Sequence, residues 1–270
     1  MIWDPSPPGV EIRLDHGLHN FGSEAYKYKV YPPGYASWCT KLPYNRPPAP
    51  GPPNPEVEKH FIIFLYGADQ SCPFVAPGKN SKDKRDYIFH PGCLKNWDTV
   101  HVFIPQHTSQ CKQPWKEQAP TWIVEFARNL RRFKPVSLVL VGFSRGGWWA
   151  CDYFTQHPDV FSGMVSIGGY PAVANNQAAE EGILAAKLIE HPYHSLWIMG
   201  ADDTLSSVGA YPAFHRALES NFDNPQCKCK FHLVLQTEHQ PLFNALLRGS
   251  NSQACRIMWE FLKGKCHFIH

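Results

Sequence analysis

Short apolar runs recur along the chain, and longer segments with apolar residues at helical spacing separate most of them. The predicted strands are 60–66, 99–104, 138–141, 162–168, 195–199 and 230–235. The predicted helices are 119–133, 147–153, 177–190, 209–220 and 242–262, the last interrupted near Gly249. Residues 26–30 alternate between apolar and lysine side chains, and this pattern predicts an early edge strand. Residues 1–25 are expected to wrap the surface.

This alternation of strands and helices predicts an α/β fold with a mostly parallel central sheet and helices on both faces. The run at 60–66 is apolar throughout, which is typical of a strand buried on both faces of such a sheet. Residues 70–98 are polar and irregular, and we expect a loop there with a short helix near 92–97.

We expect a single domain over residues 1–270, with its core at about 57–265 and a Pro-rich N-terminal extension at 1–56 that carries the edge strand. Seven prolines between Pro43 and Pro55 exclude a helix or a central strand in that segment. The segment is either an extended surface connection or a docking site for a polyproline-binding partner.

Composition narrows the choice of partners. The net charge of +3 over 270 residues and the lack of long basic runs argue against nucleic acid as a partner. The apolar runs are too short to span a membrane. Residues 1–20 hold neither a basic segment nor an apolar segment of a secretory signal, so we expect a cytoplasmic protein.

The nine cysteines are therefore expected to be free thiols. Cys227 and Cys229 have a C-x-C spacing, and zinc bound there with His232 is an alternative to ordinary packing. We expect no metal and no cofactor, and the oligomeric state is not predicted.

One stretch carries the chemistry. Residues 137–153 predict a strand, a tight turn and a helix, and Ser144 lies at the apex of the turn within the pattern G-x-S-x-G. Such a turn holds the serine in a strained backbone conformation and exposes its hydroxyl at the end of the strand. Gly142 and Gly146 fit because a Cβ at either position would crowd the neighbouring strand and helix.

A serine hydroxyl is a poor nucleophile unless a base and an orienting carboxylate activate it. Two later predicted strands are followed by such groups: Asp202 and Asp203 after 195–199, and His239 after 230–235. Since the carboxyl ends of parallel strands meet at one edge of the sheet, we expect a Ser–Asp–His triad there. One of the two aspartates is expected to cap the following helix instead.

The stretches GFSRGG, GADD and TEHQ, in this order, resemble the α/β-hydrolase superfamily over about residues 57–265. The resemblance implies Ser144 as nucleophile, His239 as base and Asp203 as acid, with Asp202 as the fallback. It also implies an oxyanion hole built from the backbone amides of Arg145 and Ala68. The family has His-Gly where this chain has Tyr66-Gly67, which makes the oxyanion loop less regular.

Lids of the family commonly follow the strand at 162–168, and only about two dozen residues separate it from the next predicted strand, so we expect no large cap domain. The resemblance implies cleavage of small or medium carboxylic esters through an acyl-enzyme. Tyr170, Trp115 and Tyr211 lie in loops and are candidates for an aromatic acyl pocket or for ordinary packing. The alternatives are a thioesterase or serine peptidase with the same triad, or a non-catalytic binding protein on this fold.

Overall fold

The computed structural model describes residues 10–15, 17–31, 59–65, 100–106, 122–169, 177–203, 212–221, 227–238, 242 and 253–266. Its strands are β1 (Gly17–Phe21), β2 (Ser23–Tyr31), β3 (His60–Leu65), β4 (Val100–Gln106), β5 (Ser137–Phe143), β6 (Gly163–Ile167), β7 (His194–Gly200) and β8 (Cys229–Val234). Its helices are α1 (Trp122–Leu130), continued by the 3-10 turn η3 (Arg131–Phe133), α2 (Arg145–Gln156), α3 (Gln177–Ile189), α4 (Pro212–Glu219) and α6 (Gln253–Lys265).

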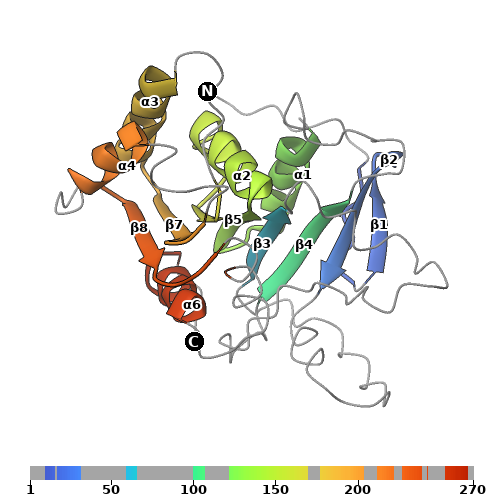
Figure 1. Cartoon of the computed structure of the whole chain (residues 1–270). Coiled ribbons are helices and arrows are strands. Elements are labelled where there is room, and N and C mark those ends of the chain that lie inside the picture. Colours follow the sequence, from blue (N-terminus) through green and yellow to red (C-terminus); the bar gives the residue numbers. More distant parts are fainter. Residues whose placement is uncertain are drawn as a thin grey trace, which may run out of the picture.

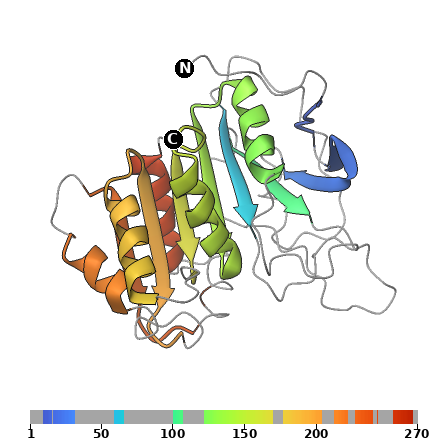
Figure 2. The ribbon, with the colours of Figure 1, turned by 90° about the horizontal axis from the view of Figure 1, so that it is seen from above.

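All eight strands form one sheet in the order β1-β2-β4-β3-β5-β6-β7-β8 (Figure 1). The strands from β4 to β8 in this order are parallel, whereas β1 pairs with β2 and β2 with β4 in antiparallel fashion. Helices α1, α2, α3 and α4 pack on one face and α6 on the other, as Figure 2 shows from above. The predicted α/β class with helices on both faces is confirmed.

Strands β3 and β5 are buried along their whole length. Both faces of these central strands are covered, so a continuous apolar run is the pattern that burial requires. For this reason the predicted strands at the centre of the sheet agree with the structure to within one or two residues at each end.

Two boundaries differ from the predictions in ways that the local structure explains. Helix α2 begins at Arg145, directly after the serine, and not at Gly147. Strand β4 continues through Pro105, which was expected in a loop. The proline is tolerated because β4 pairs with β3 only as far as Phe103, so the missing N–H breaks no bond in the parallel ladder. Residues 243–252, where the last helix was expected to be interrupted, lie outside the described residues, as do the segments 32–58 and 66–99.

The predicted edge strand is β2, but the edge itself is occupied by β1, which the sequence pattern did not reveal. The expectation that residues 1–25 only wrap the surface was therefore wrong. Strand β1 alternates in its burial, yet its outward-facing Leu18 is half exposed and its inward-facing His19 is polar. Because Leu18 and His19 occupy the opposite sides to those expected, the hydrophobic pattern gave no strand signal.

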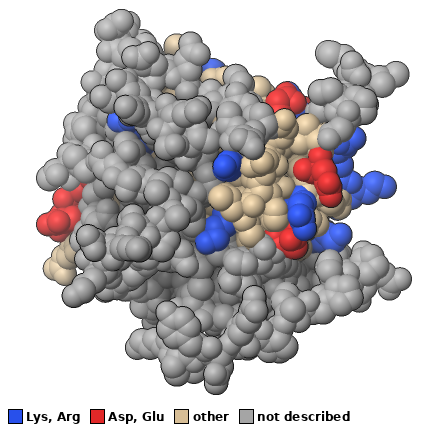
Figure 3. Space-filling model, turned by 90° about the vertical axis from the view of Figure 1, so that its right-hand side faces the viewer, with Lys and Arg blue, Asp and Glu red and all other residues tan. Residues whose placement is uncertain are grey.

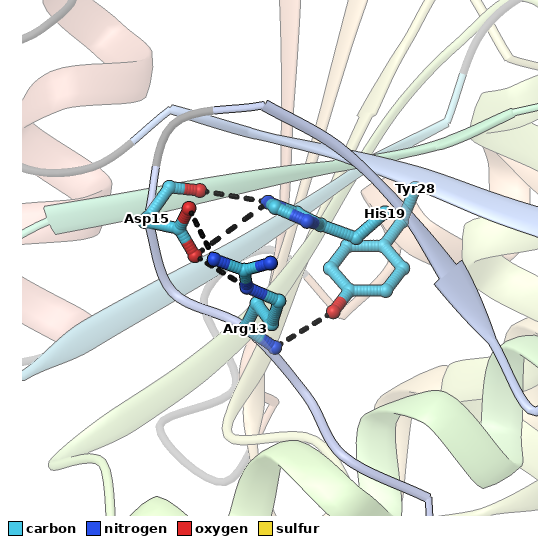
Figure 4. Close-up of polar contacts among 4 residues, drawn as sticks. All are labelled: Arg13, Asp15, His19 and Tyr28. Atoms are coloured by element: carbon cyan, nitrogen blue, oxygen red, sulfur yellow. Dashed lines mark hydrogen bonds and ion pairs between the residues drawn. The ribbon is translucent and has the colours of Figure 1, made fainter.

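A cluster of polar contacts holds the segment before β1 against the hairpin that β1 and β2 form (Figure 4). The backbone N–H of Arg13 donates to the buried Tyr28 hydroxyl at 2.8 Å, and its guanidinium contacts both carboxylate oxygens of Asp15 at 3.0 and 3.2 Å. His19 Nε2 lies 2.9 Å from the backbone oxygen of Asp15 and therefore donates to it. The exposed Arg13–Asp15 pair adds little stability by itself. The hydrogen bond to Tyr28 ties the segment to the core.

The described surface over this side of the molecule carries both signs of charge. Figure 3 shows Lys and Arg side chains interspersed with Asp and Glu side chains, with no field of a single sign among the described residues. In the parts of the chain that are described, no helix is long and apolar enough to cross a membrane. Four cysteines of the described segments are free and buried: Cys151, Cys227, Cys229 and Cys266.

His101 on β4 gives the fold a predicted sensitivity to acid. Its ring is 3% exposed and lies against Phe61 and Phe103, and burial, with a smaller contribution from the charge of Lys59, lowers its pKa from 6.5 to about 4. The unfolded chain takes up the proton near pH 6.5 and the folded chain only near pH 4. Stability is therefore full well above pH 6.5 and falls as the pH drops toward 4, by about 2–3 kcal/mol at pH 4.5.

Urea unfolding of the wild type and of His101→Phe at pH 7.5 and pH 4.5 measures this contribution. The variant should lose less stability between the two pH values by about 2 kcal/mol, because phenylalanine keeps the ring contacts and cannot be protonated. Equal losses in the two proteins would show that other groups cause the acid sensitivity.

Candidate functional site

The candidate nucleophile lies where the buried strand β5 passes into helix α2. Ser144 has φ 55° and ψ −123°, a conformation that side-chain-bearing residues rarely adopt and that costs about 1–3 kcal/mol. Its side chain makes no capping hydrogen bond to the helix that it precedes. The serine is therefore held in a strained turn with its hydroxyl not used for the helix, which is the arrangement that the G-x-S-x-G pattern predicts.

The neighbouring strand and the helix fix this strained turn from both sides. The N–H of Ser144 donates to the carbonyl oxygen of Ile167, at the end of β6, at 2.8 Å. The carbonyl oxygen of Ser144 accepts from the N–H groups of Gly147 and Trp148 at 2.9 and 3.2 Å. A Cβ on Gly142 would collide with the backbone carbonyl of Gly146, so the prediction that this position requires glycine is confirmed.

A second close approach lies beneath the turn and involves residues that the sequence analysis did not single out. A Cβ on Gly147 would lie 2.6 Å from the hydroxyl oxygen of Ser166 and 3.0 Å from the Cα of Gly169. Ser166 is fully buried on β6 and pairs with Gly142 on β5. The lack of side chains at Gly147 and Gly169 lets helix α2 sit directly against the end of β6. The paired glycines at 146–147 and 168–169 were the available signal.

The two candidate acids differ sharply in their surroundings. Asp203 follows strand β7 and is fully buried, whereas Asp202 is exposed. Strands β5 and β7 both pair with β6, so Ser144 and the end of β7 are two strand spacings apart, about 10 Å. A histidine between the two could reach both. Asp203 therefore has the burial expected of an orienting carboxylate, and Asp202 has not.

The loop after β7 is bonded to the loop after β8. The N–H of Ala201 donates to the carbonyl oxygen of Val234 at 2.9 Å, and the N–H of Asp202 donates to that of Thr237 at 3.1 Å. A Cβ on Gly200 would collide with the same Thr237 oxygen, so the two loops approach as closely as backbones allow. Thr237 lies two residues before His239 in the sequence, so the loop that carries the predicted acid is bonded to the chain just before the predicted base.

Helix α2 directs its first N–H groups toward this end of the sheet. The N–H of Arg145 is the first of the helix and has no carbonyl partner within it, and the helix dipole adds positive potential there. Both features suit the binding of a developing oxyanion. Ala68, His239, Trp115, Tyr170 and Tyr211 lie outside the described residues, so their predicted roles stay predictions.

Several solved structures with the same architecture are named as esterases or as α/β-hydrolases. A thermostable esterase matches with a TM-score of 0.54 at 14% identity over 91% of this chain, which spans 63% of the length of that esterase. MGS-MChE2, an α/β-hydrolase enzyme from a sediment metagenome of the lagoon of Mar Chica, matches with a TM-score of 0.53 at 12% identity over 92% of this chain and 98% of its own. The chain has the α/β-hydrolase fold. Esterase 2 of Thermogutta terrifontis, phosphonylated by cyclosarin, matches with a TM-score of 0.56 at 12% identity over 95% and 94% of the two chains.

No protein-family model and no curated protein matches the sequence. The likeness to the solved α/β-hydrolase structures therefore concerns the fold. In the described residues between β6 and β7 the only helix is α3, and no cap domain is present there, as predicted. Among the described residues no group of His, Cys, Asp and Glu side chains is arranged to hold a metal ion, and this applies to Cys227, Cys229 and His232 as well.

Proposed function

We propose that this protein is a serine hydrolase that cleaves carboxylic esters through an acyl-enzyme on Ser144. The backbone of Ser144 carries the proposal, because φ 55° between a buried strand and a helix has a cost that an ordinary turn would avoid. The buried Asp203 at the end of β7 and the α/β-hydrolase fold support it. That several solved structures of this fold are named as esterases supports the choice of reaction.

The proposed reaction has two halves. Ser144 Oγ attacks the ester carbonyl carbon while His239 takes the hydroxyl proton, and Asp203 holds the imidazole in the required tautomer. The amides of Arg145 and Ala68 stabilise the oxyanion of the tetrahedral intermediate. His239 then gives its proton to the leaving alcohol, and the acyl-enzyme forms. A water molecule then attacks the acyl carbonyl carbon while His239 takes its proton, and His239 returns the proton to Ser144 Oγ as the bond between Ser144 and the acyl group breaks and the acid leaves.

The proposed substrates are esters with small or medium acyl or alcohol groups. The absence of a cap between β6 and β7 in the described residues supports an open site. Tyr170, Trp115 and Tyr211 are proposed as the aromatic side of an acyl pocket. A thioesterase or a serine peptidase would use the same three side chains, since the leaving group is selected by pocket shape.

The test is the intact mass of the protein after treatment with a fluorophosphonate, combined with turnover of p-nitrophenyl esters. We expect one adduct on the wild type, none on Ser144→Ala and little on His239→Ala, because the probe requires an activated serine. Ser220→Ala is the matched control, since this hydroxyl is exposed, donates to a carbonyl within its own turn and accepts from Asn221.

Labelling that survives in Ser144→Ala, or a wild type that neither reacts with the probe nor cleaves any ester, would contradict the proposal. The second result would favour a binding protein on this fold. A panel of p-nitrophenyl esters, acyl-CoA thioesters and aminoacyl amides separates the esterase from the thioesterase and the peptidase. The proposed ester preference requires that kcat/KM be highest for the oxygen esters.

A further inference from the structure

The residue after the candidate nucleophile is a cation that has no counter-ion among the described residues. Arg145 is partly buried, and its Nε is completely inaccessible and has no hydrogen-bond partner. In the described part of the chain, no hydrogen bond or ion pair of its guanidinium is observed. A buried charged donor without an acceptor is unfavourable, and such groups are rare unless a ligand or a water completes them.

The other partly buried arginines of the described segments show what is missing. Arg128 pairs with the carboxylate of Glu125 at 2.9 Å. Arg131 donates to the carbonyl oxygen of Val160 at 2.7 Å and to the hydroxyl of Ser162 at 3.1 Å. The Nε of Arg128 is buried without a hydrogen-bond partner, like that of Arg145, but the guanidinium of Arg128 still has a carboxylate beside it. Among the described residues Arg145 has neither kind of partner, although its guanidinium is permanently charged like theirs.

The position of Arg145 makes the missing partner more significant. It is the first residue of α2, where the positive end of the helix dipole disfavours a cation. Stability alone would favour an acidic or neutral residue there. An anion near Ser144 would satisfy both the guanidinium and the helix end, and the planar guanidinium matches a carboxylate in bidentate geometry.

We propose that Arg145 is a specificity-determining residue that binds an anionic group of the substrate, so that the preferred esters carry a carboxylate a few bonds from the scissile carbonyl. The inference rests on the proposed ester hydrolysis at Ser144. The side chain of Arg145 and its backbone amide then have separate tasks, the first binding the substrate anion and the second the oxyanion.

The test compares mono-p-nitrophenyl glutarate with p-nitrophenyl pentanoate, two esters of similar length that differ in the terminal carboxylate. We expect the wild type to have a higher kcat/KM for the glutarate ester, and Arg145→Met to lose this preference by about tenfold or more. Arg145→Lys should keep part of it, and the preference should fall with added salt. Arg256→Met, which removes an exposed arginine of α6, is the matched control and should keep the wild-type ratio.

A wild type that cleaves the neutral ester as well as the anionic one, or a preference that Arg145→Met retains, would overturn the inference and leave the proposed ester hydrolysis intact. If no ester is cleaved at all, the proposed function fails, and calorimetry with glutarate still decides the inference. Glutarate binding that is lost in Arg145→Met supports the anion site, and no binding to the wild type overturns it. Equal melting temperatures of the variants exclude misfolding as the cause.

Discussion

Asp203→Asn is expected to lower kcat for ester hydrolysis by about a thousandfold to ten-thousandfold, while Asp202→Asn leaves it within about twofold of the wild type. An asparagine at position 203 keeps the shape of the side chain but removes the charge that stabilises the imidazolium, and its NH₂ group favours the wrong histidine tautomer. Asp202 is exposed, and its contact with the loop after β8 is made by its backbone N–H, which the substitution retains.

The two substitutions are a matched pair because the residues are adjacent, equal in charge and changed in the same way. The kcat values of both variants and their melting temperatures form the measurement. Asp203 is fully buried, so its variant must be shown to be folded before the rate is interpreted. If kcat falls more in Asp202→Asn than in Asp203→Asn, Asp202 is the acid of the triad. If kcat falls only slightly and equally in both variants, no triad acid follows β7.

The strands at the centre of the sheet were predictable because burial on both faces gives an unambiguous pattern. The elbow was predictable for a related reason, since the strand, the glycines and the helix around Ser144 all indicate the same turn. The outer strand β1 was not predictable from its hydrophobic pattern, because His19 faces inward and Leu18 outward. What decides its position is the antiparallel pairing with the adjacent strand β2 and the hydrogen bond from the N–H of Arg13 to the Tyr28 hydroxyl.

The contacts beneath the elbow show a second limit of sequence reasoning. Ser166, Gly147 and Gly169 are close in space only because β6 lies beside β5 and α2 returns over it. The hydrogen bond from the N–H of Asp202 to the carbonyl oxygen of Thr237 likewise joins loops more than thirty positions apart in the sequence. A sequence pattern places a serine, an acid and a histidine in order along the chain. It does not show which backbone contacts hold their loops in place, and those contacts determine how well the site is organised.

Gly142→Ala should lower the free energy of unfolding by about 3 kcal/mol or more, a large part of the total for a domain of ordinary stability. The new methyl group would meet the backbone carbonyl of Gly146 and would lie 2.6 Å from the nitrogen of Gly147. Neither neighbour is the end of a flexible side chain, so the strand and the first turn of α2 must separate. The same shift would move Ser144, and labelling by a fluorophosphonate should fall together with stability.

Gly182→Ala provides the control for the loss of a glycine. Gly182 lies within α3, and a Cβ there would meet nothing within 4 Å, so alanine should stabilise the protein by about 0.5–1 kcal/mol through its higher helix propensity. Urea unfolding of both variants gives the two values, and opposite signs are expected. If the free energy of unfolding of Gly142→Ala lies within about 1 kcal/mol of the wild-type value and the variant is labelled at the same rate, the close approach of Gly142 and Gly146 does not hold the serine in its strained conformation.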